Sequence, residues 1–265
     1  MTAAGPSVET RTLVLRGAQH RTQLLRTATA FDTWLIVLHE GLGSIPQWRS
    51  FPGDLARTIG VNTAVYERRN HGGSGLLPEP RGPGYHAEEA EIVDELMTAL
   101  DIERAFTYGH SDGATIALLH AAHHPDRVAA VVSEAGHVIT EDVAREGILH
   151  ARRLYASGEL RDALVRYHGD HTDAMFSAWA DTWLDPAFED WSIIDEVKDV
   201  VAPVLAIQGE LDPYGTPDHV RWIADAVSGP AETWVLPGIG HAPHREAGSA
   251  VVARVVQFLG KYGVV

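Results

Sequence analysis

One serine of this chain lies in a pattern typical of a nucleophile. The segment Gly109-His-Ser111-Asp-Gly113 fits G-x-S-x-G, and it joins a predicted strand at 105–110 to a predicted helix at 114–123. The sharp turn at such a junction lifts the hydroxyl away from the sheet, and the two glycines let neighbouring backbone pass closely. The free N–H groups at the start of the helix then lie beside the oxygen of a reacting carbonyl. We therefore expect Ser111 to attack a carbonyl carbon.

A serine hydroxyl is a poor nucleophile at neutral pH and needs a base. We expect this base to be His241, in the segment Leu236-Pro-Gly-Ile-Gly-His241-Ala-Pro-His244. The segment is a glycine-rich loop between a predicted strand at 232–236 and the last predicted helix at 247–262. His244 is the alternative base, but it lies nearer to the start of that helix.

The base must in turn be oriented by an acid. Asp212 follows the predicted strand at 204–208, and its Asp-Pro turn would present a carboxylate at the carboxyl edge of the sheet. Glu134 is a competitor, because it ends the predicted strand at 128–133. We prefer Asp212, and we expect Glu134 to be a substrate-binding residue on the pocket wall or to hold a loop.

Acyl transfer also needs two N–H donors aimed at the developing oxyanion. We expect one from Asp112, the residue after the nucleophile, and one from Gly41 in the loop His39-Glu-Gly-Leu-Gly43, with Leu42 as the alternative. Glu40 brings a carboxylate into this oxyanion-hole loop. We expect it to form an ion pair with Arg68 or Arg69, and the alternative is a free carboxylate near the oxyanion.

Short β-branched runs alternate with helical patterns along the chain, which predicts a parallel β/α architecture. The expected strands are 12–16, 22–26, 34–39, 63–67, 105–110, 128–133, 204–208 and 232–236, and the expected helices include 88–100, 114–123 and 247–262. From the fourth strand onward the runs are apolar without alternation, as in a sheet covered on both faces. The alternation breaks between about 136 and 197. We therefore predict a core of 1–135 and 198–265 with a helical cap at 136–197.

The predicted cap is rich in aromatic residues. Trp179 and Trp183 are four residues apart, so a helix would place them on one face. We expect that face to roof the pocket and to bind substrate. The alternative is that these rings, with Tyr155, Tyr167, Phe176, Phe188 and Trp191, only pack the cap against the core.

The composition excludes several classes of protein. A net charge of -15 disfavours nucleic acid and anionic membranes, and the absence of cysteine excludes disulfides and thiolate metal sites. We see no signal pattern and no apolar run long enough to span a bilayer, so we expect a cytoplasmic protein with no membrane partner. The fifteen histidines include His168-Gly-Asp-His171 and His120-Ala-Ala-His123-His124. Neither group matches a metalloprotease helix, and we expect no metal and no cofactor. Association into a homo-oligomer stays open.

These motifs together resemble the α/β-hydrolase superfamily over nearly the whole chain. Two further segments are similar to it: Val65-Tyr-Glu-Arg-Arg-Asn-His-Gly-Gly-Ser74, after the fourth strand, and His124-Pro-Asp-Arg-Val128, before the sixth. The resemblance implies a mostly parallel eight-stranded sheet flanked by helices, with a small helical cap. It also implies a catalytic triad in the order Ser111, Asp212, His241.

The function that we expect is that of a serine esterase or lactonase. It would cleave a small or medium, partly apolar substrate through an acyl-enzyme. Alternatives on the same triad are C–C bond hydrolysis, acyl transfer, perhydrolysis and thioester hydrolysis, and the least favoured alternative is a non-catalytic ligand-binding protein. Dehalogenase and epoxide-hydrolase chemistry is disfavoured, because relatives with those activities carry a carboxylate at the elbow.

Overall fold

Eight strands form one sheet in the computed structural model, which describes residues 5–28, 31–76 and 81–265. The strands are β1 (Ser7–Leu15), β2 (Ala18–Arg26), β3 (Phe31–Leu38), β4 (Val61–Tyr66), β5 (Ala105–His110), β6 (Val128–Glu134), β7 (Val204–Gly209) and β8 (Ala231–Leu236). Their order in the sheet is β1-β2-β4-β3-β5-β6-β7-β8. The pairs of β1 with β2 and of β2 with β4 are antiparallel, and the other pairs are parallel. The predicted mostly parallel, eight-stranded sheet is confirmed.

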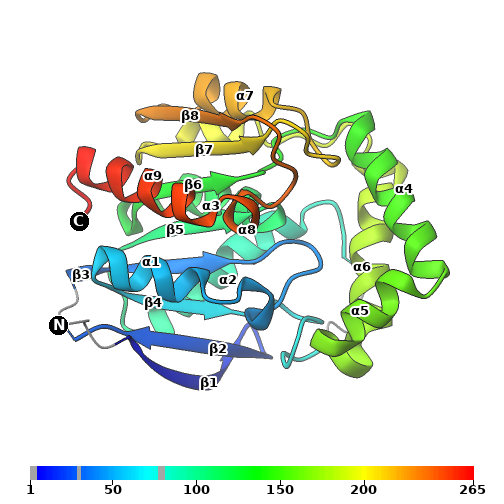
Figure 1. Ribbon diagram of the computed structural model, residues 1–265, viewed down its shortest axis with the longest axis horizontal. Coiled ribbons are helices and arrows are strands. Elements are labelled where there is room, and N and C mark those ends of the chain that lie inside the picture. Colours follow the sequence, from blue (N-terminus) through cyan, green and yellow to red (C-terminus); the bar gives the residue numbers. More distant parts are fainter. Residues whose placement is uncertain (1–4, 29–30, 77–80) are drawn as a thin grey trace.

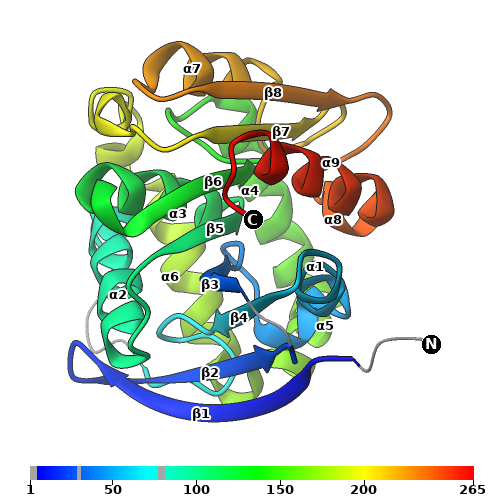
Figure 2. The same cartoon turned by 90° about the vertical axis from the view of Figure 1, so that its left-hand side faces the viewer.

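Helices cover both faces of the sheet (Figures 1 and 2). They are α1 (Phe51–Ile59), α2 (Tyr85–Ala99), α3 (Asp112–His123), α4 (Asp142–Ala156), α5 (Glu159–His168), α6 (Thr172–Leu184), α7 (Asp218–Ala226), α8 (Pro243–Glu246) and α9 (Gly248–Lys261). One face packs against α2, α3 and α7 in a core that includes Leu96, Ile116 and Ile223. The opposite face packs against α1 and α9 in a core that includes Leu55 and Val255. Covered on both sides, β5, β6 and β7 are buried at every position, which explains their unbroken apolar runs.

Both ends of the sheet differ from the sequence prediction. Strand β8 is not buried throughout: it lies at the sheet edge and is half exposed, and its Glu232 binds Arg254 and Lys261 of α9. Strand β1 is longer than the predicted 12–16 because it forms a hairpin with β2. The two-residue turn Arg16-Gly17 has positive φ at both positions (45° and 73°), as tight hairpin turns require.

Helices α4, α5 and α6 form the cap, which lies between β6 and β7 in the chain and beyond the carboxyl ends of the parallel strands (Figure 1). The cap has its own apolar cluster, which includes Ile148, Leu164, Phe176 and Trp183. It faces the edge of the sheet where the loops after β3, β5, β7 and β8 meet. No helix in the described parts of the chain is long and apolar enough to cross a membrane.

Candidate active site

Ser111 occupies a strained turn between β5 and α3. Its backbone has φ 54° and ψ -119°, a region that residues with a side chain rarely adopt. A Cβ atom at Gly109 would overlap the backbone of Gly113, and one at Gly113 would overlap the carbonyl of Leu38. Glycine is therefore required at both positions, because three backbone segments pass one another here without room for side chains.

His241 and Asp212 are joined by a hydrogen bond at the same edge of the sheet. His241 lies in the loop after β8, and its Nδ1 is 2.7 Å from Oδ2 of Asp212, which follows β7. Asp212 also accepts hydrogen bonds from Gln208 Nε2 at 2.7 Å and from the Tyr214 N–H at 2.8 Å. Burial acts to raise the pKa of Asp212, but the charge and hydrogen bond of His241 and the Tyr214 N–H hold that pKa below its usual value. The carboxylate is thus ionised at neutral pH and fixes the proton of His241 on Nδ1.

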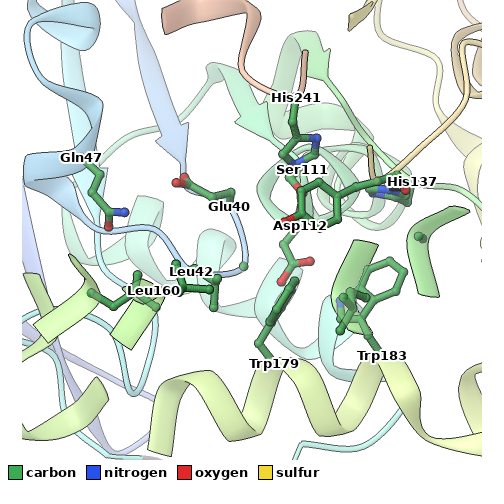
Figure 3. Close-up of a pocket in the computed structure, with 15 residues that line it drawn as sticks. Glu40, Leu42, Gln47, Ser111, Asp112, His137, Leu160, Trp179, Trp183 and His241 are labelled. Carbon is green, nitrogen blue, oxygen red and sulfur yellow. Dashed lines mark hydrogen bonds between the residues drawn. The ribbon is translucent and has the colours of Figure 1, made fainter. Parts of the chain in front are cut away.

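Ser111 and His241 line one cavity of about 200 Å³ between the sheet edge and the cap. Its walls are formed by Glu40, Gly41, Leu42, Gln47, Ser111, Asp112, His137, Ala144, Ile148, Leu160, Leu164, Trp179, Trp183, Tyr214 and His241. Figure 3 shows Ser111 next to the His241 ring, with Glu40 and His137 on opposite sides and the two tryptophans toward the cap. The structure therefore brings the three predicted triad residues to one place.

The segments expected to donate to an oxyanion border the same cavity. Gly41 and Leu42 lie on one side of Ser111, and Asp112 begins α3. A Cβ atom at Gly41 would overlap the indole of Trp179, so the cap packs directly on this peptide. The first N–H groups of a helix have no partner within the helix, and the Asp112 N–H belongs to that set.

Glu40 differs from the sequence expectation. Its carboxylate pairs with Arg245 at 3.3 Å and lies 3.6 Å from His110 Nδ1, not with Arg68 or Arg69. Arg68 reaches the backbone carbonyl of Glu40 instead, at 2.8 Å. Helix α8, which sequence reasoning did not connect with Glu40, supplies Arg245.

Glu134 does not line the cavity, so the prediction that it contacts substrate there is wrong. It is fully buried behind the site, where Oε1 is 2.5 Å from His244 Nδ1 and Oε2 accepts the His244 backbone N–H at 3.1 Å. The Tyr108 hydroxyl also donates to it. Glu134 ends β6 and binds His244 in α8, so it holds the end of the loop that carries His241. The expected loop-holding role therefore describes it better.

One described group of three side chains has the composition of a metal site. A ligand atom from each of His110, Glu134 and His244 lies within 4.8 Å of the others. Both Glu134 oxygens already accept hydrogen bonds, and His110 Nε2 donates to the carbonyl of His241 at 2.7 Å. These contacts make the group a hydrogen-bonded support under the His241 loop.

The histidine clusters noted in the sequence lie elsewhere. His123 and His124 pair with Glu91 on the outer side of α2 and α3. His168 is a cap residue whose Nε2 donates to the Leu42 carbonyl at 3.1 Å, so it connects α5 to the loop after β3.

Sequence reasoning missed seven of the residues that line the cavity. Four are apolar cap residues, and the three with polar side chains are Gln47, His137 and Tyr214. Tyr214 follows Asp212, and its ring centre is 4.7 Å from that of His241. His137 follows β6, and its Nε2 donates to the Tyr214 carbonyl at 2.9 Å. Burial lowers the pKa of His137 to about 4, so its ring is neutral. His137 and Tyr214 both follow a parallel strand at the carboxyl edge of the sheet. That position is the sequence feature that could have identified them as residues of the cavity wall.

Two of the seven aromatic residues singled out in the cap line the cavity, namely Trp179 and Trp183. Trp183 also donates from Nε1 to the Tyr85 hydroxyl at 3.0 Å. The other rings stack among themselves or reach the surface: Tyr155 on Phe176, Phe188 on Trp191, and Tyr167 exposed.

Comparison with known proteins agrees with this architecture. A protein of an Enterobacter species, 2-succinyl-6-hydroxy-2,4-cyclohexadiene-1-carboxylate synthase, is 24% identical over 260 residues, covering 85% of this chain and 91% of its own length. Among solved structures, a 2-hydroxy-6-oxo-6-phenylhexa-2,4-dienoate hydrolase from a Rhodococcus species superposes with a TM-score of 0.82 at 14% identity, covering 96% of this chain and 99% of its own. An enol-lactonase from Burkholderia xenovorans gives a TM-score of 0.74 at 20% identity, covering 94% of this chain and 100% of its own.

These two structural likenesses show the fold alone, because their sequence identities are low. The sequence profile of the alpha/beta hydrolase fold matches residues 33–177, which is more than half of the chain and includes the turn at Ser111, the loop after β3 and most of the cap. This chain therefore belongs to the alpha/beta hydrolase fold family.

Proposed function

We propose that this chain is a serine hydrolase that cleaves a carboxylic ester or lactone with a small, uncharged acyl group. The observation that carries the proposal is the 2.7 Å hydrogen bond between Asp212 and His241 at the wall of the cavity that also holds Ser111. A base oriented by an ionised acid, beside a serine on a strained turn, is the arrangement that activates a hydroxyl for attack on a carbonyl.

The reaction follows in two halves. Ser111 Oγ attacks the carbonyl carbon while His241 Nε2 takes its proton, and Asp212 stabilises the imidazolium through Nδ1. The N–H groups of Gly41 and Asp112 bind the oxyanion. When the tetrahedral intermediate collapses, the C–O bond breaks and His241 gives the proton to the leaving alcohol. Water, deprotonated by His241, then attacks the acyl-enzyme, and the acid leaves Ser111 with its proton restored.

The cavity supports a small acyl group. Its volume of about 200 Å³ is below the roughly 300–1,000 Å³ of sites for drug-sized ligands. The cap contributes apolar side chains to it, including Ile148, Leu160, Leu164 and Trp179. Burying an alkyl chain against them contributes about 0.8 kcal/mol per methylene. An acyl chain of a few carbons fits both the volume and the lining.

The charges around the cavity support an uncharged acyl group. No lysine or arginine is among the described residues that line it, whereas Glu40 and Asp112 both do. Burial acts to raise the pKa of each carboxyl, but hydrogen bonds and charges from His110 and Arg245 hold the pKa of Glu40 low, and His86 and Arg68 do the same for Asp112. An anionic substrate would lie beside the ionised Glu40 carboxylate, while the Asp112 carboxylate is buried and paired with Arg68. The names of the Enterobacter and Rhodococcus relatives include a carboxylate, and the cavity disfavours such a group in this chain.

Two matched substrates test the proposal. p-Nitrophenyl butyrate and the mono-p-nitrophenyl ester of succinic acid both carry four-carbon acyl groups, and only the second has a free carboxylate. We expect kcat/KM to favour the butyrate by about tenfold or more, which corresponds to about 1.4 kcal/mol, and we expect Ser111→Ala to hydrolyse neither. A thioester and a lactone of the same acyl size, assayed beside them, rank the bond types. Turnover by pure Ser111→Ala, or a preference for the succinate, would contradict the proposal.

A further inference from the structure

Arg68 is a buried cation that takes no part in the proposed triad. Arg68, two residues after the end of β4, is 1% exposed and lies under the oxyanion-hole loop. Its Nη2 donates to the carbonyl oxygens of Glu40 at 2.8 Å and His39 at 3.4 Å. Its Nη1 is 3.2 Å from Oδ2 of Asp112. A buried guanidinium is stabilised by paired donors. Nε of Arg68 has no partner among the described residues, whereas the partners of Nη1 and Nη2 come from both sides of the nucleophile.

A histidine supports the same carbonyl. The backbone N–H of Arg68 donates to His39 Nε2 at 3.0 Å, which leaves the proton of the neutral ring on Nδ1. Nδ1 then donates to the Glu40 carbonyl at 2.7 Å. The Glu40 carbonyl oxygen thus accepts side-chain hydrogen bonds from Arg68 and His39, in addition to one from the Gly43 backbone N–H at 3.0 Å, and its direction is fixed.

The Glu40 carbonyl and the Gly41 N–H are the two ends of one planar peptide group. Fixing the oxygen therefore fixes where the Gly41 N–H points. A hydrogen bond from a cation to the carbonyl also polarises that peptide and strengthens its N–H as a donor. On the opposite face of the loop, the indole of Trp179 packs on Gly41. The orientation of this N–H is determined from both sides.

We propose that Arg68 is a positioning residue for the oxyanion hole, holding the Gly41 N–H through the Glu40 carbonyl and the Asp112 N–H through the Asp112 carboxylate. This inference rests on the proposed function, in which those two N–H groups bind the oxyanion. Arg68 touches no reacting atom. It sets the spacing between two donors that belong to different elements, the loop after β3 and the first turn of α3.

The test compares Arg68→Lys with Arg69→Lys. A lysine has one compact ammonium group and cannot hold both partners in the fork geometry of a guanidinium. Arg69 is the matched control, because its guanidinium pairs with Glu88 at 3.9 Å on α2. The readouts are kcat and KM for a neutral ester, and Ki for a trifluoromethyl ketone that forms a tetrahedral adduct with the serine. If Arg68 only supported the fold, Ki for this transition-state analogue and kcat would not change together while KM stayed constant.

For Arg68→Lys we expect kcat to fall about 10- to 100-fold and Ki to rise by a similar factor, because loss of a complete oxyanion donor costs about 100- to 1,000-fold. KM should change by less than about threefold, and Arg69→Lys should resemble wild type in all three constants. If Arg68→Lys does not fold, His39→Gln removes the other side-chain support of the same carbonyl and should show the same coupled change in kcat and Ki. Unchanged kcat and Ki in a folded Arg68→Lys protein whose wild type depends on Ser111 would overturn this inference alone. Wild-type turnover that does not depend on Ser111 would overturn the proposed function as well.

Discussion

Replacing either acidic candidate by its amide tests which carboxylate orients the catalytic base. In the structure Asp212 Oδ2 faces both His241 Nδ1 and Gln208 Nε2, while Oδ1 accepts the Tyr214 N–H. In Asp212→Asn, the Tyr214 N–H favours the amide oxygen at the Oδ1 position. The amide NH₂ then faces His241 Nδ1 and turns that nitrogen into an acceptor.

The proton of His241 would consequently move to Nε2, the nitrogen that must accept the proton of Ser111. An imidazole in this tautomer cannot act as the base. We expect kcat to fall by about 10³ to 10⁴, which is about 4 to 5.5 kcal/mol of transition-state stabilisation. The opposite amide orientation would point NH₂ at the Tyr214 N–H, so it does not rescue the enzyme.

In Glu134→Gln, an amide NH₂ likewise replaces one carboxylate oxygen, but it faces His244 and not His241. Its amide oxygen can keep the Oε2 contacts with the Tyr108 hydroxyl and the His244 N–H, and its NH₂ then faces His244 Nδ1. His244 can accept that hydrogen bond by changing tautomer, because burial keeps the pKa of the ring below its usual value despite Glu134. We expect kcat within about tenfold of wild type, and a free energy of unfolding lower by about 1–3 kcal/mol for the weakened buried network.

The assay is kcat on one activated ester for both variants, with urea unfolding as the control for folding. Near-wild-type turnover for Asp212→Asn, or a larger loss for Glu134→Gln in folded protein, would refute the assignment of Asp212 as the acid.

Three further predictions concern the cap, the oxyanion-hole loop and a buried histidine. Trp179→Ala should move the preferred acyl chain to greater length while lowering the free energy of unfolding by about 3 kcal/mol; an unchanged chain-length profile in an ester series would show that Trp179 does not bound the acyl site. Gly41→Ala should lose activity because its methyl group overlaps the Trp179 indole, and the Gly41→Ala/Trp179→Ala double variant should recover part of kcat; equal activity of both proteins would argue against that contact. His120 is fully buried, neither ring nitrogen has a hydrogen-bond partner among the described residues, and burial lowers its pKa to about 3. Because the folded pKa lies below the unfolded value of about 6.5, this histidine destabilises the protein progressively as pH falls below 6.5. His120→Leu should therefore gain about 2 kcal/mol of relative stability between pH 8 and pH 5, measured by urea unfolding, and parallel pH profiles for the two proteins would contradict this.

The parts of the site that depend on local pattern could be predicted from the sequence. The elbow around Ser111 and the loops of Asp212 and His241 each follow an apolar strand, and parallel strands bring their carboxyl ends to one edge. Helix α1 (Phe51–Ile59) was missed, because Pro52 and Gly53 in its first turn are typical of loops as well as of helix starts.

The supporting contacts could not be predicted, because they join residues far apart in the chain. Glu134 meets His244 across 110 positions, and Arg245 meets Glu40 across 205. Sequence spacing says which side chains reach the sheet edge, but not which of them face the cavity. Arg68 shows this most clearly: an ion pair with the Glu40 carboxylate was the natural expectation, and the backbone carbonyl is the group that it binds.

Detection of an acyl-enzyme on Ser111 would show that this serine is the nucleophile. Wild-type protein is mixed with p-nitrophenyl butyrate, quenched in acid within the first turnovers, and analysed by intact mass and by peptide mapping. We expect a butyryl adduct on the peptide that contains Ser111, and none in Ser111→Ala. Rapid release of p-nitrophenol by the wild type with the adduct on another residue, or the same adduct in Ser111→Ala, would contradict this expectation.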